Sequence, residues 1–180
     1  MSVIVLGVSG SVSVYKACDL ASKLVQAGHT VRTVMTDSAA ELVSPQLFEA
    51  ITSEAPFVDE FSEERQGGMD HIEVVRGAEL FLVAPMTANL AARLSLGVAD
   101  DLVSTVSLAL AAGVPRLACP AMNPAMLLHP AVQRNLKTLA EDGWEVMEPG
   151  SGNMACGDEG PGRLPEPSEI SAKVEELLGR

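Results

Sequence analysis

The chain has 180 residues, of which 24 are acidic and 12 basic, and its formal net charge at pH 7 is −12. This length suits one domain with a substantial core, and an acidic chain without a Lys/Arg cluster does not favour a surface that follows nucleic-acid phosphates. No apolar run reaches the ~20 residues of a membrane span, and no basic segment precedes the first apolar run as in a signal peptide. We therefore expect a single cytoplasmic domain over residues 1–180, without a membrane or nucleic-acid partner.

Strand-like apolar runs alternate with helical patterns along the chain. In chain order the pattern predicts a strand at 3–8, a helix at 12–27, a strand at 30–36, a helix beginning at Pro45, a strand at 79–85, helices at 87–95 and 101–112, a strand at 114–120, a helix from Pro124 to about Leu139, a strand at 144–148 and a helix at 166–179. Two segments, 62–70 and 149–163, are predicted to be loops. This alternation favours an α/β fold, with a parallel sheet covered by helices on both faces.

Ligands of such sheets bind at the carboxyl ends of the strands. Small polar residues follow four predicted strands there, at 9–11, 36–38, 85–89 and 120–123. The first of these loops enters a helix, whose free N–H groups favour an anion. The loop lacks the third glycine of GxGxxG, so a single terminal phosphate, as on FMN, fits it better than a dinucleotide pyrophosphate. The alternative interpretation is an ordinary strand-to-helix turn, with Thr36 and Ser38 acting only as helix caps.

The three histidines differ in their surroundings. His29 follows a glycine and His129 precedes a proline, and both are predicted to be surface turn residues. His71 closes the polar segment 62–70 and begins the run HIEVV. A lone histidine is more often structural than catalytic, so His71 is a candidate only if further residues support it.

The three cysteines are too few and too irregularly spaced for a disulfide framework or a zinc site, and no metal is expected. Cys18 and Cys119 lie in apolar periodic runs and are predicted to be core residues. Cys156 stands between Ala155 and Gly157 in the glycine-rich segment 149–163. A thiol in such a segment is better placed to react than one in a core.

Five segments, in this order and spanning residues 3–163, resemble the motifs of the flavin-containing cysteine decarboxylases. GVSGSVSVYK resembles the opening GxxGSxAxYK, DHIEV the catalytic-histidine segment, APMTANL the PASANT motif and PAMNPAML the PxMNxxMW motif. GNMACGDEGPGR resembles the GxxACGxxGxGR segment of the phosphopantothenoylcysteine decarboxylases. The chain departs from these motifs at Met86, Leu90, Leu127 and 77–79, around the expected flavin and substrate pockets.

The resemblance implies a Rossmann-like flavoprotein fold and a homotrimer or dodecamer with FMN near a subunit interface. The residues implied to hold FMN follow three strands: Ser9, Gly10, Ser11, Thr36, Ser38, Pro85, Thr87, Ala88 and Asn89. The substrate would be 4′-phosphopantothenoyl-L-cysteine, held by Asn123, Met126 and Ala155 beneath a clamp formed by residues 149–163. His71, from the adjacent subunit, would be the acid or base of the first oxidation, and Cys156 the proton donor of the final reduction.

The implied reaction oxidises the thiol-bearing carbon to a thioaldehyde, loses CO2, and returns the electrons to give 4′-phosphopantetheine for coenzyme A biosynthesis. A peptidyl-cysteine decarboxylase, which makes aminoenethiols and stops before the reduction, is the alternative, and the ACG motif around Cys156 disfavours it. The DHI and PAMN segments disfavour a flavin prenyltransferase, and the first loop disfavours a NAD-dependent reductase. Intact His71 and Cys156 disfavour a flavin-binding regulatory subunit without activity. A ligase domain, or a ligase enzyme of the same pathway, is the expected partner, because the two are fused in many bacteria.

Overall fold

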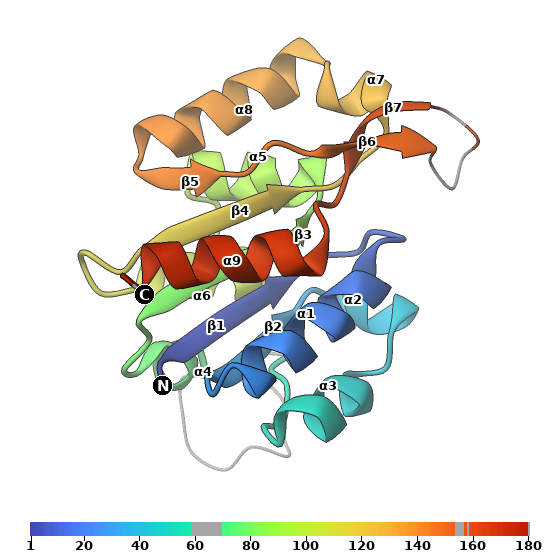
Figure 1. Cartoon of the computed structure of the whole chain (residues 1–180). Coiled ribbons are helices and arrows are strands. Elements are labelled where there is room, and N and C mark those ends of the chain that lie inside the picture. Colours follow the sequence, from blue (N-terminus) through green and yellow to red (C-terminus); the bar gives the residue numbers. More distant parts are fainter. Residues whose placement is uncertain (59–69, 154–156, 158, 180) are drawn as a thin grey trace.

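The computed structural model of the chain describes residues 1–58, 70–153, 157 and 159–179. Within these residues, five parallel strands form one sheet in the order β2-β1-β3-β4-β5 (Figure 1). The strands are β1 (Val3–Val8), β2 (Thr30–Met35), β3 (Leu80–Met86), β4 (Arg116–Pro120) and β5 (Trp144–Val146). All five fall where the apolar runs predicted them. The strands β1 and β3 are nearly continuous apolar runs, because each is covered by helices on both faces.

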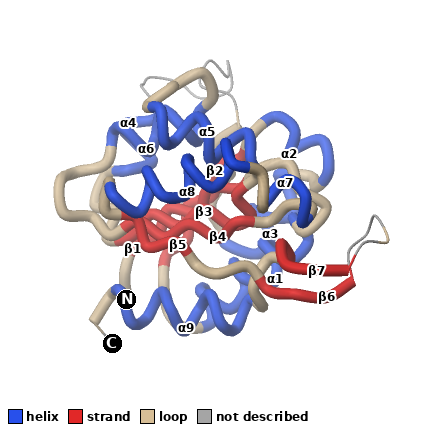
Figure 2. Tube along the Cα trace, turned by 90° about the horizontal axis from the view of Figure 1, so that it is seen from above, coloured by secondary structure: helices blue, strands red, loops and turns tan. Residues whose placement is uncertain are grey.

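Helices cover both faces of the sheet (Figure 2). One face carries α1 (Val14–Gln26), α3 (Pro45–Thr52) and α9 (Pro167–Leu177), and the other carries α4 (Asp70–Val75), α5 (Ala88–Leu96), α6 (Leu102–Ala109) and α8 (Pro130–Glu141). Successive side chains of β1 point to opposite faces, so Ile4 and Leu6 pack with the first group of helices and Val5 packs with the second. The predicted α/β fold with a helix-covered parallel sheet is confirmed.

The strand order reverses its direction between β1 and β3. The chain passes from β1 outward to β2 and then returns to β3 on the other side of β1. A sheet of this kind binds its ligands at the carboxyl ends of the strands beside that point. The end of β3 is irregular there: its pairing with β4 shifts between Val83 and Met86, and the Ala84–Pro85 peptide bond is cis.

The helix expected from Pro124 to about Leu139 is two helices. α7 (Pro124–Leu127) ends before Leu128, and α8 begins at Pro130. Proline suits the first position of a helix and cannot continue one, because it lacks an N–H group. His129 accepts a hydrogen bond from the Ala131 N–H at its Nδ1 (3.2 Å) and so caps α8. A second short helix, α2 (Asp37–Leu42), follows β2.

The segment 149–163 is not simply a loop, because its two ends pair as an antiparallel hairpin, β6 (Gly150–Asn153) with β7 (Glu159–Arg163). The sequence analysis did not predict β6 and β7, because their glycines weaken the pattern that is typical of a strand. Residues 154–156 and 158, which include Ala155 and Cys156, lie outside the described residues. So does the predicted loop 62–70 up to position 69, and α4 begins at Asp70.

His29 is not a surface turn residue, as its neighbours suggested. Its side chain is fully buried, and its Nε2 lies 2.7 Å from Glu175 Oε1. Glu175 belongs to α9, which lies 146 residues away in sequence, so local sequence gave no sign of the contact. Cys119 is a core residue as predicted, and Cys18 is partly buried against the core. None of the helices within the described residues is long and apolar enough to cross a membrane.

Candidate functional site

The loops after β1 and β3 are joined through Ser9. Its buried hydroxyl donates a hydrogen bond to the Pro85 carbonyl (2.8 Å) and accepts one from the Thr87 N–H (3.0 Å). Thr87 in turn caps α5, since its hydroxyl accepts a hydrogen bond from the Leu90 N–H (3.3 Å). The Ser9 hydroxyl therefore donates its proton to another group of the protein and not to a ligand. The same side chain fixes the spacing of two of the loops predicted to bind a ligand.

The loops after β1 and β2 are in close contact at Gly10 and Ser38. A Cβ atom placed on Gly10 would lie 2.4 Å from Ser38 Oγ and 2.7 Å from Ser38 Cβ, so no side chain fits there. Ser38 Oγ lies 3.1 Å from Thr36 Oγ1, and Thr36 caps α2 through the Ala39 N–H. Thr36 therefore has the capping role of the alternative interpretation, and it also lies beside Ser38, where the two loops meet.

Ser11 and Ser13 complete this group of hydroxyls at the start of α1. Their Oγ atoms lie 2.9 Å apart, and Ser11 Oγ also accepts a weak hydrogen bond from the Ser13 N–H (3.3 Å). We call Gly10, Ser11 and Ser38 the hydroxyl cradle. The cradle offers hydroxyls and backbone amides without a charged side chain, which is a donor set that suits one phosphate held close to the backbone.

A cavity of about 440 Å³ lies beside the cradle and shares Ser11 with it. Three segments far apart in the sequence form its wall: Ser11, Val12, Ser13, Tyr15 and Lys16 at the start of α1, Ala121, Met122 and Asn123 after β4, and Asn153, Gly162, Arg163 and Leu164 of the hairpin. The Met122 N–H donates to the Gly162 carbonyl (2.9 Å), which joins the last two segments. The volume of the cavity is within the range of small-molecule binding sites.

Of the predicted substrate-binding residues, Asn123 lines this cavity. Its Oδ1 accepts a hydrogen bond from the Ala125 N–H (2.8 Å), so the cap of α7 fixes the side chain at the wall. Met126 lies on α7 and is half-exposed, but it is not among the described residues of the wall. Ala155, the third predicted residue, lies outside the described residues.

Two cations in the wall, Lys16 and Arg163, were missed in the sequence. Lys16 Nζ lies 2.7 Å from Glu166 Oε1, and Arg163 Nη2 lies 3.9 Å from the same oxygen. The hydrogen bond from Lys16 holds the pKa of Glu166 below its usual value. Lys16 is the last residue of GVSGSVSVYK, and Arg163 is the last residue of GNMACGDEGPGR. Because both segments resemble family motifs, these positions could have identified the two cations as candidate site residues.

His71 does not line the cavity within the described part of one chain. It is the second residue of α4, and α4 leads into the amino end of β3. A helix of six residues rises only about 9 Å, whereas the seven residues of β3 span about 23 Å. His71 therefore stays short of the carboxyl ends of the strands, where the cradle lies. The far end of α4 is held by Arg32, whose Nη1 donates to the carbonyls of Val74 (3.1 Å) and Arg76 (2.7 Å).

Three departures from the resembled motifs are core residues. Met86 and Leu90 pack in the cluster between the sheet and α5, and they are 0% and 1% exposed. Leu127 packs with Met122 and Val132 in a smaller cluster and is 6% exposed. None of the three side chains lines the described cavity wall. These three differences therefore change core packing and leave the described cavity wall unchanged.

Comparison with known proteins gives one family and a consistent set of relatives. The family model described as Flavoprotein matches residues 1–179. The Coenzyme A biosynthesis bifunctional protein CoaBC of Bacillus subtilis is 46% identical over 167 residues, which is 93% of this chain and 41% of that protein. The protein of the same name from Mycolicibacterium smegmatis is 41% identical over 177 residues, 98% of this chain and 42% of that protein. The chain thus spans about two-fifths of the length of these relatives.

Solved structures of similar fold include cysteine decarboxylases. A PPC decarboxylase mutant complexed with pantothenoylaminoethenethiol has a TM-score of 0.88, with 28% identity and 99% of both chains covered. The FMN-dependent cysteine decarboxylase SpaF has a TM-score of 0.82, with 32% identity over 99% of this chain and 98% of the other. The FMN binding protein AtHal3 has a TM-score of 0.83, with 29% identity over 99% and 97%.

Proposed function

The chain belongs to the Flavoprotein family, and from this premise we propose that residues 1–180 are one domain that binds FMN and decarboxylates 4′-phosphopantothenoyl-L-cysteine to 4′-phosphopantetheine. This is a carboxy-lyase step of coenzyme A biosynthesis, and we assign it to the cytoplasm. The observation that carries the proposal is the shared position of Ser11, which belongs both to the hydroxyl cradle and to the cavity wall. A phosphate in the cradle and a substrate in the cavity would therefore be neighbours.

The cradle fits the single phosphate of FMN. The missing side chain at Gly10 lets the Ser38 hydroxyl lie directly beside the loop after β1, because a Cβ on Gly10 would collide with Ser38. The hydroxyls of Ser11 and Ser38, with Thr36 beside them, would hold the phosphate. Residues 85–89, where β3 ends and α5 begins, would face the ring system. When bound, FMN supplies the electron acceptor that a simple cysteine carboxylate lacks.

The cavity would hold the cysteine end of the substrate against Asn123. The capped side chain of Asn123 is fixed before any ligand arrives, which suits a group that orients a carboxylate. Met126, half-exposed on the next turn, would add an apolar contact. In the same proposal Ala155 and Cys156, between the two strands of the hairpin in sequence, would close over the substrate, and Cys156 would give a proton to the carbon that becomes saturated.

His71 would act as the acid or base of the oxidation from a second copy of the chain. Within one chain it lies on α4, away from the carboxyl ends of the strands, so a subunit interface must bring it to the cavity of a neighbour. We therefore propose a homotrimer or a dodecamer. Because the curated relatives are bifunctional and more than twice as long, a ligase domain or a ligase enzyme of the same pathway is the proposed partner.

The alternative substrate is a peptide with a C-terminal cysteine, with release of an aminoenethiol. Two cations in the cavity wall favour a small phosphorylated substrate over an extended neutral peptide. The test is mass spectrometry of the purified protein, with its bound cofactor, after incubation with each substrate. We expect released FMN and loss of CO2 from 4′-phosphopantothenoyl-L-cysteine. Recovery of FAD or NAD, or turnover of the peptide alone, would contradict the proposal.

A further inference from the structure

The wall of the cavity is basic, although the chain is acidic. Its charged side chains, within the described residues, are Lys16 and Arg163, and no Asp or Glu lines it. The whole chain carries twice as many acidic as basic residues. Two like charges on the wall of one cavity attract an anion and repel a cation. The cavity is therefore suited to a ligand with a negative group in addition to whatever the cradle holds.

The two cations are not equivalent, because Lys16 donates a hydrogen bond to Glu166 whereas Arg163 lies farther from the same carboxylate. Lys16 is 91% buried, and its hydrogen bond to Glu166 is short at 2.7 Å. The same Glu166 oxygen lies 3.9 Å from Arg163 Nη2, which is beyond hydrogen-bond distance. Arg163 is also the more exposed of the two, with 42% of its side chain accessible. In the described part of the chain, Arg163 is thus the wall cation whose guanidinium is more accessible to a ligand.

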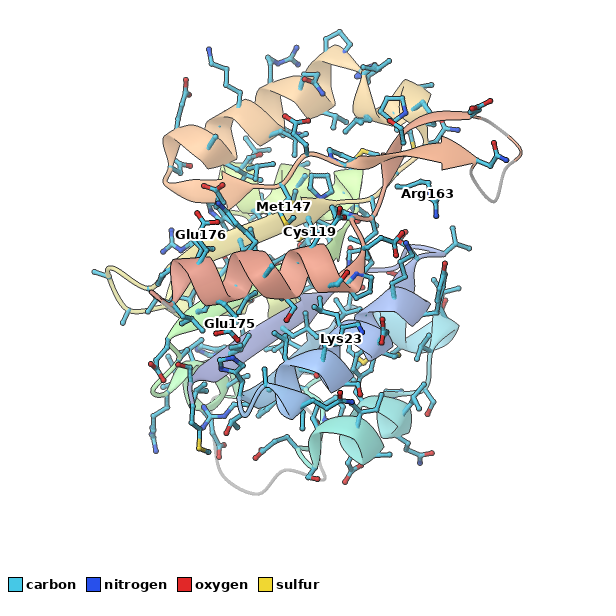
Figure 3. The ribbon with its side chains drawn as sticks, viewed as in Figure 1. Lys23, Cys119, Met147, Arg163, Glu175 and Glu176 are labelled. Atoms are coloured by element: carbon cyan, nitrogen blue, oxygen red, sulfur yellow. The ribbon has the colours of Figure 1, made fainter. Side chains whose placement is uncertain are left out.

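The hairpin positions Arg163 before any ligand binds. A Cβ placed on Gly152, in the neighbouring strand, would lie 2.9 Å from Arg163 Nη1, so the missing side chain at Gly152 makes room for the guanidinium. The residue before Arg163 is tied to the loop after β4 by the Met122–Gly162 hydrogen bond. Arg163 leaves the hairpin on the side of the loop that follows β1 (Figure 3). A guanidinium carried by this hairpin can form two parallel hydrogen bonds to a phosphate.

We propose that Arg163 binds the phosphate of the substrate and so selects the phosphorylated molecule over its unphosphorylated form. This inference rests on the proposed function, because it assigns one end of the same cavity. In this proposal Asn123 orients the cysteine carboxylate, and Arg163, on the hairpin, binds the phosphate. Glu166 forms a hydrogen bond with Lys16 and lies farther from Arg163, so its carboxylate disfavours an anion more strongly at Lys16 than at Arg163.

The test compares 4′-phosphopantothenoyl-L-cysteine with pantothenoyl-L-cysteine in the FMN-loaded protein. In Arg163→Gln the ratio of kcat/KM between the two substrates falls about 10- to 100-fold, the usual range for a charge-assisted bond. Arg163→Lys keeps the charge without the paired geometry and loses part of the ratio. Arg134→Gln, on the exposed surface of α8, is the matched control and keeps it. Thermal melting of each variant checks that it is folded. If Arg163→Gln is unfolded, the comparison is made with Arg163→Lys alone.

Two outcomes overturn the inference. If the ratio of kcat/KM for the two substrates is unchanged in both Arg163 variants, another group binds the phosphate. A weaker affinity of Arg163→Gln for FMN, at an unchanged ratio, assigns Arg163 to the cofactor phosphate. If the wild type turns over neither substrate, the proposed function fails by itself. Calorimetric titration with 4′-phosphopantothenate and pantothenate then decides the role of Arg163, and equal binding of the two compounds by the wild type overturns it.

Discussion

Replacing Gly10 with alanine tests the hydroxyl cradle directly. The new Cβ would lie 2.4 Å from Ser38 Oγ, 2.7 Å from Ser38 Cβ and 3.0 Å from its carbonyl carbon. Gly10 is not among the residues with positive φ, so the contact and not backbone strain sets the cost. Rotation of the Ser38 side chain relieves the first contact but leaves the second and third, and the two loops must separate. Such overpacking costs about 1–3 kcal/mol, or a fall of roughly 3–10 °C in Tm for a chain of this size.

Because the loops separate where the phosphate is proposed to bind, Gly10→Ala should also weaken FMN binding. Melting of the apoprotein and fluorescence titration with FMN measure the two effects separately. Gly150→Ala is the matched control, since its nearest contacts would be at 3.7 Å and 3.8 Å. The double variant Gly10→Ala/Ser38→Gly removes the two shortest contacts and should recover most of the Tm. Wild-type Tm and wild-type FMN affinity in Gly10→Ala would refute the reasoning.

Three further predictions follow from single contacts. Burial raises the pKa of the Cys119 thiol, which lies beside Met147 between β4 and α9 (Figure 3), so mass spectrometry should find Cys119 unlabelled by iodoacetamide at pH 8 until the protein unfolds; rapid native labelling would show that the core is open there. The Lys16 hydrogen bond lowers the pKa of Glu166, so its contribution to stability is present above the unfolded pKa and is lost as pH falls through the lower folded pKa. The wild type should therefore lose its advantage over Glu166→Gln below about pH 4, by less than about 1 kcal/mol since Glu166 is mostly exposed; a constant difference from pH 3 to pH 7 would contradict this. Arg32→Met removes the donor to the carbonyls at the end of α4 and should speed amide hydrogen exchange in residues 70–75 with a small change in Tm; unchanged exchange there would mean that other contacts hold the helix.

The fold was predictable because its strongest signals are local. The runs at 3–8 and 79–85 are apolar enough to indicate buried strands without any partner, and the structure has β1 and β3 there. Ser44-Pro45 and Asn123-Pro124 marked the starts of α3 and α7 correctly. The prediction of one helix from Pro124 to about Leu139 was wrong, because Pro130 begins a new helix with His129 as its cap.

Contacts between distant segments were not predictable from one sequence. His29 looked like a turn residue because its burial depends on Glu175, far away in α9. Lys16 and Arg163 were not predicted to be site residues, because neither residue is unusual in its local sequence. They line one cavity because the hairpin lies beside the start of α1 in the folded chain. Asn123 was predicted by resemblance and lines that cavity, whereas the roles of His71 and Cys156 stay predictions, since one depends on a second subunit and the other lies outside the described residues.

The central claim is that this chain performs an FMN-dependent decarboxylation in which no net oxidation occurs. The most direct measurement is the number of turnovers of 4′-phosphopantothenoyl-L-cysteine under strictly anaerobic conditions, without an added electron acceptor or donor, with the product identified by mass spectrometry. The account predicts many molecules of 4′-phosphopantetheine per bound flavin, because the electrons taken from the thiol-bearing carbon return to the same molecule. A single turnover that ends with reduced flavin and an aminoenethiol, or no release of CO2 at all, would contradict it.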